Sequence, residues 1–174
     1  MNRLVKKSSM VIISLLVLTV SLFSGCIQEN EDMGSLTIGQ DAPSFTAKLK
    51  GGKTFNMDDH KDEIVLVNFW ATWCPPCVGE MPELQKISDE GLDGVTIICI
   101  NCGEDQSTVD SFVDEKGFNL NIGYDPDGSI ATKYPSEYIP YTVIVKNGKV
   151  EAEFVGVPED PYNAYRDTII GLMN

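Results

Sequence analysis

The sequence predicts an α/β domain built on a mixed β-sheet. Two stretches, Glu63–Trp70 ("EIVLVNFW") and Gly94–Ile100 ("GVTIICI"), are almost continuously apolar and rich in β-branched residues, as expected for central strands buried on both faces. Near the C-terminus, Asn147-Gly148 separates two strand-like runs, which is a strong signal for a β-hairpin. Strands that alternate with helices and then end in a hairpin indicate a mixed sheet covered on both faces.

The first elements are a small β-hairpin, the first buried strand and a helix. Phe45–Leu49 and Lys53–Asn56 flank Gly51-Gly52, which supplies the positive φ angles of a tight turn. The helix should begin near Pro75 or Pro76, because proline suits the first helical turn. Its apolar residues recur at helical spacing: Val78, Met81, Leu84 and Ile87.

The second buried strand is followed by a helix over Ser107–Lys116 and a short strand around Asn119–Gly123. The C-terminal hairpin pairs Tyr141–Val145 with Lys149–Gly156, and a last helix runs from about Pro161 to Leu172. The expected order is ββ–β–α–β–α–β–α–ββ–α. Its third helix, without assigned bounds, stands between the short strand and the hairpin.

The first residues have the pattern of a secretory signal peptide. Three basic residues precede an apolar run of 14 residues from Met10 to Phe23, and small residues follow. A transmembrane span needs roughly 20 residues, so a transmembrane anchor is the weaker interpretation. Ser24-Gly25-Cys26 resembles the lipobox of prokaryotic lipoproteins, in which the cysteine is lipidated, although Phe23 stands where leucine is usual.

These observations divide the chain into three parts: a lipoprotein-type signal peptide (1–25), a polar, acidic tether (26–37) and one folded domain (38–174). A lipid on Cys26 would anchor the exported protein to the cell membrane without spanning it. The whole sequence has a net charge of −13, and removal of residues 1–25 would leave 10 basic against 26 acidic residues, about −16. So acidic a chain is not expected to bind nucleic acid or anionic lipid headgroups.

Cys74 and Cys77 lie where the first buried strand turns into a helix. A thiolate at a helix N-terminus is stabilised by unsatisfied N–H groups and by the positive end of the helix dipole. Cys74 is therefore the predicted nucleophile. Cys77 lies about one turn further on the same side, where it can attack a mixed disulfide formed by Cys74.

A four-cysteine metal site that includes Cys99 and Cys102 is an alternative. On a strand, however, residues i and i+3 point to opposite faces, so Cys99 is expected in the core. Cys102 is expected either to pack or to support the redox pair. His60 is the single histidine, which argues against a mixed Cys/His zinc site. We expect no metal, and no cofactor beyond the redox-active Cys74–Cys77 disulfide.

The segment "VLVNFWATWCPPCVGEMPEL" resembles the active-site segment of the thioredoxin superfamily and, more narrowly, of the membrane-anchored TlpA/ResA-type thiol–disulfide oxidoreductases. "IPYTVIVKNGKVEAEFVG" resembles the superfamily's second landmark, a cis-proline followed by a strand hairpin, which would be Pro140. The resemblance covers residues 38–172. It implies a thioredoxin fold with an N-terminal β-hairpin and an inserted strand-helix unit at about Asn101–Tyr134.

The resemblance also implies which residues surround the dithiol. Ile139 and Pro140 would help to hold a substrate polypeptide near the nucleophile. Further candidates for substrate contact are Pro75, Pro76 and Trp73, which is expected to be exposed, although simple packing is the alternative for Trp73.

Glu80 matches an acid that is typical of the TlpA/ResA type. It could accept the thiol proton of Cys77 if burial raises its pKa toward neutrality, and the alternative is a solvated helix glutamate. Two positions differ from many relatives. Asn68 replaces an acidic strand residue, and Tyr141 replaces a threonine after the cis-proline, which could alter which partners dock.

The sequence is therefore interpreted as an exported, lipid-anchored, monomeric thiol–disulfide oxidoreductase. The resemblance suggests that it reduces disulfides in exported proteins, as in cytochrome c maturation, with electrons from a membrane thiol donor. Alternatives are a dithiol oxidant of exported proteins, and a non-enzymatic metal chaperone or interaction lipoprotein on the same fold. A thiol peroxidase is disfavoured by the close spacing of the two cysteines.

Overall fold

The computed structural model describes residues 36–174. The predicted signal peptide, most of the predicted tether and the predicted lipidation site Cys26 lie outside these residues. Leu36 falls within the predicted tether, yet it is 5% exposed and packs into the domain, where its N–H donates to Glu153 over 3.1 Å. No helix of the described part is long and apolar enough to cross a membrane.

The described strands form one seven-stranded sheet in the order β2-β1-β5-β4-β3-β6-β7. β3 is parallel to β4 and β4 to β5, whereas the other neighbours pair in antiparallel fashion. The sheet is therefore mixed, as predicted. The strands are β1 (Thr46–Leu49), β2 (Thr54–Asn56), β3 (Ile64–Trp70), β4 (Val95–Cys102), β5 (Asn121–Asp125), β6 (Tyr141–Lys146) and β7 (Lys149–Val155).

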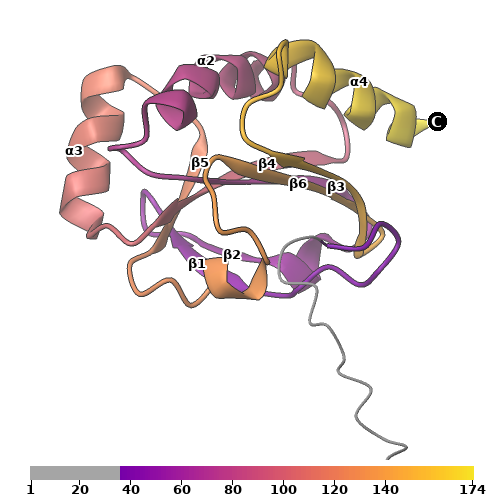
Figure 1. Cartoon of the computed structure of the whole chain (residues 1–174), viewed down its shortest axis with the longest axis horizontal. Coiled ribbons are helices and arrows are strands. Elements are labelled where there is room, and N and C mark those ends of the chain that lie inside the picture. The colour runs from indigo at the N-terminus through magenta and orange to yellow at the C-terminus, as the bar shows by residue number, and fades with distance from the viewer. Residues whose placement is uncertain (1–35) are drawn as a thin grey trace, which may run out of the picture. The chain divides into compact units, whose positions relative to one another are not determined.

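Three α-helices lie over one face of the sheet (Figure 1): α2 (Pro75–Asp89), α3 (Gln106–Lys116) and α4 (Pro161–Met173). The N-terminal hairpin extends the sheet at its β2 edge, and the other face packs against two short 3-10 helices, η1 (Met57–His60) and η2 (Ala131–Lys133). All seven residues of β3 are buried, because alternate side chains enter the two cores. This confirms β3 as a central strand buried on both faces.

The helix expected between β5 and the C-terminal hairpin is absent from the described fold, and this prediction was wrong. The stretch contains only η2. The buried carboxylate of Asp125 accepts the N–H groups of Ile130 (3.0 Å) and Ala131 (2.8 Å), which fixes a compact turn. Pro135 then disfavours helical geometry at Tyr134, whose backbone is extended.

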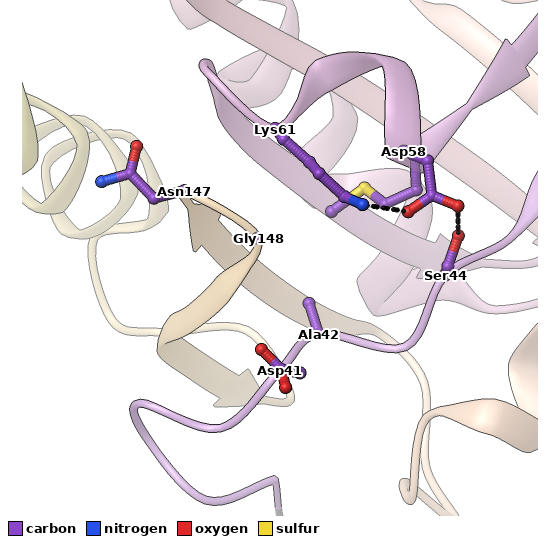
Figure 2. A pocket seen from close by; sticks show the side chains of 8 residues that line it. Asp41, Ala42, Ser44, Asp58, Lys61, Asn147 and Gly148 are labelled. Atoms are coloured by element: carbon purple, nitrogen blue, oxygen red, sulfur yellow. Dashed lines mark hydrogen bonds and ion pairs between the residues drawn. The ribbon is translucent and has the colours of Figure 1, made fainter.

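A surface pocket of about 320 Å³ lies between the N-terminal segment, η1 and the β6–β7 turn (Figure 2). On one side of it, Asp58 accepts a hydrogen bond from Ser44 and pairs with Lys61. Asn147 and Gly148, on the other side, follow the end of β6 that is opposite to Pro140. The pocket therefore shares no residue with the predicted redox site.

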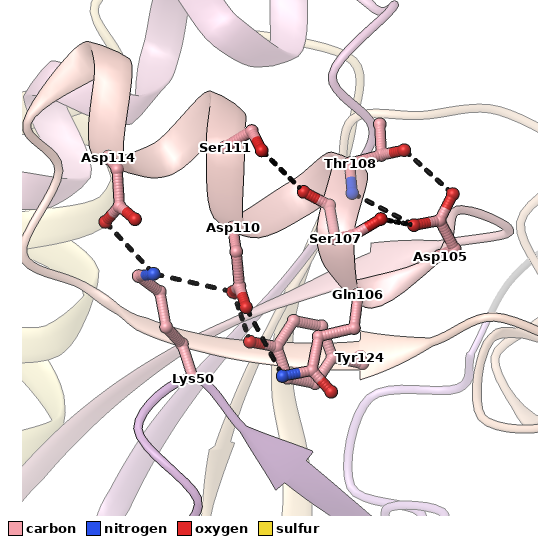
Figure 3. A network of polar contacts seen from close by, with 9 residues as sticks. All are labelled: Lys50, Asp105, Gln106, Ser107, Thr108, Asp110, Ser111, Asp114 and Tyr124. Carbon is pink, nitrogen blue, oxygen red and sulfur yellow. Dashed lines mark hydrogen bonds and ion pairs between the residues drawn. The ribbon is translucent and has the colours of Figure 1, made fainter.

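Polar contacts join α3 to the N-terminal hairpin and β5 (Figure 3). Lys50, in the β1–β2 turn, lies 3.5 Å from a carboxylate oxygen of Asp110 and 3.0 Å from one of Asp114. The Tyr124 hydroxyl of β5 also donates to Asp110. Within the stretch predicted as an inserted unit, about Asn101–Tyr134, α3 and β5 are thus connected to the hairpin at the edge of the sheet.

Candidate active site

Cys74 and Cys77 form a disulfide at the junction of β3 and α2, with their Cα atoms 5.3 Å apart. Cys74 is the N-cap of α2, and Pro75 is its first helical residue, as expected from the fixed φ and missing N–H of proline. The N–H of Cys77 points to Cys74 Sγ over 3.3 Å. One N–H donor of the helix N-terminus is thus directed at the sulfur of the predicted nucleophile.

The predicted second landmark faces the disulfide. The Ile139–Pro140 peptide bond is cis, and the carbonyl oxygen of Ile139 lies 3.8 Å from Cys74 Sγ. Trp73 is 68% exposed, and Pro75 and Pro76 are exposed as well. The two cysteines themselves are almost covered, since Cys74 is 4% exposed and Cys77 is fully buried.

Glu80 is buried on the same side of α2 as Cys77, one turn further along. Asn68 Nδ2, from β3, donates to Glu80 Oε1 over 2.6 Å, and the Tyr165 hydroxyl, from α4, donates to Oε2 over 2.9 Å. Burial raises the pKa of Glu80 to about 7, and these two hydrogen bonds oppose that rise. The carboxyl group can therefore gain or lose a proton near neutral pH.

Asn68 and Tyr165 are further connected through Thr142 of β6. Asn68 Nδ2 donates to Thr142 Oγ1 over 2.9 Å, and the Thr142 side chain counters part of the rise that burial gives to the pKa of Tyr165. The Asn68 and Thr142 side chains are fully buried, and Asn68 Oδ1 has no hydrogen-bond partner. Four secondary-structure elements thus contribute polar side chains to one buried group around Glu80.

Glu104 holds the loop that leads into Cys74. Its carboxylate accepts the Thr72 N–H over 2.7 Å and the Thr72 hydroxyl, and Asn101 Nδ2 donates to it over 2.8 Å. Glu104 follows β4, so it connects the ends of two parallel strands.

Cys99 and Cys102 are free cysteines that lie on opposite faces of β4, as predicted from their spacing. Burial raises the pKa of both thiols, that of Cys102 to about 12, so both are protonated near neutral pH. Within residues 36–174, no three His, Cys, Asp or Glu side chains are grouped so as to hold a metal ion.

The sequence did not indicate a site role for Tyr165, Thr142 or Glu104. Tyr165 belongs to an apolar stripe of the last helix, and the same pattern describes an ordinary core residue. Glu104 follows a buried strand that ends beside the redox motif, which is the only local signal that could have identified it. Tyr138, which is 68% exposed and precedes Ile139, was also missed.

Comparisons with known proteins agree with this geometry. The Redoxin family model matches residues 37–168. The thiol–disulfide oxidoreductase ResA of Oceanobacillus iheyensis is 30% identical over 156 residues, which cover 86% of this chain and 80% of that protein.

Solved structures share the fold. The Chlorobium tepidum protein assigned as the thiol:disulfide interchange protein DsbE is 25% identical, with a TM-score of 0.73 over 80% of this chain and 100% of that one. The exposed lipoprotein thioredoxin Etrx1 of Streptococcus pneumoniae is 25% identical, with a TM-score of 0.63 over 74% of this chain and 99% of that one.

The family match spans most of the domain, and its relatives are thiol–disulfide oxidoreductases. The dithiol stands at the helix N-terminus where the thioredoxin fold places its redox pair. We conclude that the chain belongs to the Redoxin family and is a ResA-type thiol–disulfide oxidoreductase of the thioredoxin superfamily, with Cys74 and Cys77 as its CxxC pair.

Proposed function

We propose that this oxidoreductase acts outside the cytoplasm, anchored through a lipid on Cys26, and reduces disulfides in exported proteins. The observation that carries the disulfide-exchange chemistry is the buried Glu80 one turn from Cys77, with a pKa raised to about 7, and the reducing direction is the one that the family resemblance suggests. A carboxylate with this pKa is suited to take the thiol proton of Cys77 when that cysteine becomes a nucleophile. The reducing cycle requires this step each time a mixed disulfide is resolved.

In the proposed cycle, the Cys74 thiolate attacks one sulfur of a substrate disulfide. A Cys74–substrate disulfide forms, the substrate disulfide breaks, and the other substrate sulfur leaves as a thiolate. Cys77 then passes its proton to Glu80 and attacks Cys74 Sγ, which forms the Cys74–Cys77 disulfide and releases the second substrate sulfur. Two electrons have passed to the substrate, whose thiolates take up protons. A membrane-bound dithiol donor returns the pair to its reduced state by the reverse exchange.

Substrates would dock on the residues around the disulfide. Trp73 and Tyr138 are the most exposed large apolar side chains there, and Ile139 and Pro140 present their backbone beside Cys74. An exported protein with a CxxC disulfide, such as an apocytochrome c, has the required chemistry. We propose that the protein acts as a monomer, because each step uses residues of one chain.

The location rests on the sequence of residues 1–26 and on relatives. A signal-like pattern ends at a lipobox-like cysteine, and the similar Etrx1 is an exposed lipoprotein. A Cys26→Ala variant, expressed with the native N-terminus, should move from the membrane fraction to the soluble fraction. Retention in the membrane fraction would contradict the lipid anchor and favour a transmembrane span.

The decisive measurement is the midpoint potential of the Cys74–Cys77 pair in the full chain. The chain would be equilibrated in graded redox buffers, and its free thiols would be trapped with a mass tag and counted. The Cys74→Ser and Cys77→Ser variants would serve as controls. A value near that of thioredoxin, about −270 mV, or lower supports a reductant. A value near about −120 mV would make the protein an oxidant instead. A pair that does not cycle, with metal bound after purification, would favour the metal-chaperone alternative.

A further inference from the structure

Tyr138 is a large aromatic residue whose side chain the fold does not use. It is 68% exposed, and within residues 36–174 its ring and hydroxyl take part in no hydrogen bond or ring contact. Six large apolar side chains of this part of the chain are exposed, and the two most exposed, Trp73 and Tyr138, both adjoin the redox site. A single exposed apolar residue needs no explanation, whereas exposed apolar residues gathered at one place mark a contact surface.

The backbone of Tyr138 is held by Ser136. The Ser136 hydroxyl donates to the Tyr138 carbonyl oxygen over 2.7 Å and accepts the Tyr138 N–H over 3.2 Å, so one side chain satisfies both backbone groups. The Ser136 N–H donates to the Tyr134 carbonyl oxygen over 2.7 Å, and the Tyr134 hydroxyl donates to the Pro43 carbonyl oxygen. The loop is thus fastened to the body of the domain, and the position of Tyr138 is set before any substrate arrives.

Tyr138 and Trp73 stand on either side of the reactive sulfur along the chain that surrounds it. Tyr138 directly precedes Ile139, whose carbonyl oxygen lies 3.8 Å from Cys74 Sγ, and Trp73 directly precedes Cys74 itself. Because β3 and β6 are antiparallel neighbours, the loop after β3 and the loop before β6 lie at the same end of the sheet. No ring contact joins the two aromatic residues of the described domain, so neither ring covers the other.

We propose that Tyr138 is a specificity-determining residue, and that the preferred substrates are polypeptides with a large apolar side chain next to the cysteine that bonds to Cys74. Ser136 is then a positioning residue, because it holds the backbone of Tyr138. This inference rests on the proposed exchange of disulfides with exported polypeptides, and it adds the class of side chain that the site selects.

The selection follows from what surrounds the mixed disulfide. While the substrate cysteine is bonded to Cys74, its neighbours in the substrate chain are held near Tyr138. An apolar neighbour leaves water and packs on the tyrosine ring, which lowers the free energy of the mixed disulfide. An acidic neighbour gains nothing from the ring and meets Glu137, which is exposed directly before Tyr138, so that two like charges repel.

The test measures exchange between the reduced full chain and short peptides that contain a Cys-Ala-Ala-Cys disulfide. In each exchange two electrons pass to the peptide, whose disulfide becomes two thiols, while the Cys74–Cys77 disulfide forms. In one series the residue before the first peptide cysteine is leucine, serine, lysine or aspartate. In a second series the residue after the second peptide cysteine is varied in the same way.

The leucine peptide should react about tenfold faster than the serine peptide in at least one series, as expected when one large apolar side chain is largely removed from water. The aspartate peptide should be the slowest in that series. Equal rates for leucine and serine in both series would overturn the inference. A lysine peptide that reacts fastest would overturn it as well, because the surface would then select charge.

Variants of Tyr138 locate the selection. The quantity compared is the ratio of the leucine rate to the serine rate, because a general effect on exchange cancels in this ratio. Tyr138→Ala should lower the ratio to twofold or less, whereas Tyr138→Phe should keep it, since the ring remains. Ile38→Ala is the matched control, because Ile38 is 55% exposed and lies beside Val150, toward the opposite end of β7. A ratio that survives Tyr138→Ala, or that is lost in Tyr138→Phe, would overturn the assignment.

Two variants of Ser136 test the positioning role. Ser136→Ala removes both hydrogen bonds to the Tyr138 backbone and should lower the leucine-to-serine ratio severalfold. Ser136→Thr keeps a hydroxyl group and should restore the ratio. If Ser136→Ala has the same ratio as the unmodified chain, Ser136 is not a positioning residue.

Failure of this inference is distinguishable from failure of the proposed function. If the reduced chain exchanges with none of the peptides, the proposed reduction of polypeptide disulfides is wrong, and the selection is wrong with it. If it exchanges with all of them at rates that do not depend on the neighbouring side chain, the oxidoreductase stands and selection by Tyr138 does not.

Discussion

The backbone N–H of Thr72 donates to Glu104 Oε2 over 2.7 Å, so the loop that enters the CxxC motif is fastened to the end of the neighbouring strand. The same carboxylate accepts the Thr72 hydroxyl and the amide of Asn101. Three donors on one carboxylate make a charge-assisted cluster, which is stronger than a set of neutral hydrogen bonds.

Replacing Glu104 with glutamine should loosen this loop. The amide can accept at one atom only, so at least one Thr72 donor loses its partner, at an expected loss of about 1–3 kcal/mol. Urea unfolding would measure the loss, and hydrogen exchange at the Thr72 N–H should become faster by tenfold or more. Glu115→Gln is the matched control, because the Glu115 side chain is 74% exposed and pairs only with Lys116 among the contacts observed. Equal stabilities of the two variants would contradict the expectation.

Glu80 should make stability depend on pH. Its pKa is raised from 4.5 to about 7 by burial, so the folded protein binds this proton more tightly than the unfolded chain does. Stability from this group is therefore lost as the pH rises from about 4.5 to about 7, by roughly 3 kcal/mol, and does not return above that range.

The comparison with Glu80→Gln isolates this effect, because the other acidic groups are common to both proteins. The unfolding free energies of the unmodified chain and of Glu80→Gln would be measured in urea at several pH values. As the pH rises from 5 to 8, the unmodified chain should lose stability relative to the variant. A difference that is independent of pH would show that Glu80 titrates normally in the folded chain.

Trp73→Ala should separate substrate contact from stability. The side chain is 68% exposed, so the unfolding free energy should change by less than about 0.5 kcal/mol. Exchange with a disulfide-containing protein should slow about tenfold, because large aromatic side chains dominate contact surfaces. Exchange with a small disulfide should stay the same. Met173→Ala, exposed at the end of α4, serves as the control and should affect neither rate.

Gly123→Ala should destabilise the sheet. A Cβ atom at this position of β5 would lie 2.6 Å from Ile100 Cδ1 and 3.3 Å from Ala47 Cβ, so neighbouring core residues must shift. Such overpacking costs about 1–3 kcal/mol. Gly171→Ala in α4 has nothing within 4 Å of its new methyl group, and should instead stabilise the protein by about 0.4–1 kcal/mol. Thermal unfolding of both variants would test the contrast.

Much of the fold was predictable because its signals are local. The apolar run of β3, Pro75 at the start of α2 and the Asn147-Gly148 turn each act within a few residues. The missing third helix was mispredicted because the Asp125 carboxylate shapes that loop, and a propensity pattern does not show where a buried carboxylate points.

The site was predictable only in part, for a related reason. Cys74, Cys77 and Pro140 carry specific motifs. Tyr165, however, reaches Glu80 across 85 positions of the chain, and Thr142 reaches Asn68 across 74. Contacts between such distant positions depend on how the elements pack, and helical or strand periodicity indicates only that these residues face inward.

The ends of the sheet have a consequence for self-association. β2, at one edge, has only three residues, and residues 39–42 cover part of β7 at the other edge through backbone hydrogen bonds with Gly148 and Val150. Uncovered edges are the usual route by which folded chains add to one another as continuous sheets. A sheet whose edge strands are this short or this well covered offers few free backbone groups to a neighbouring chain, so the folded domain is not expected to add to other chains as a continuous sheet.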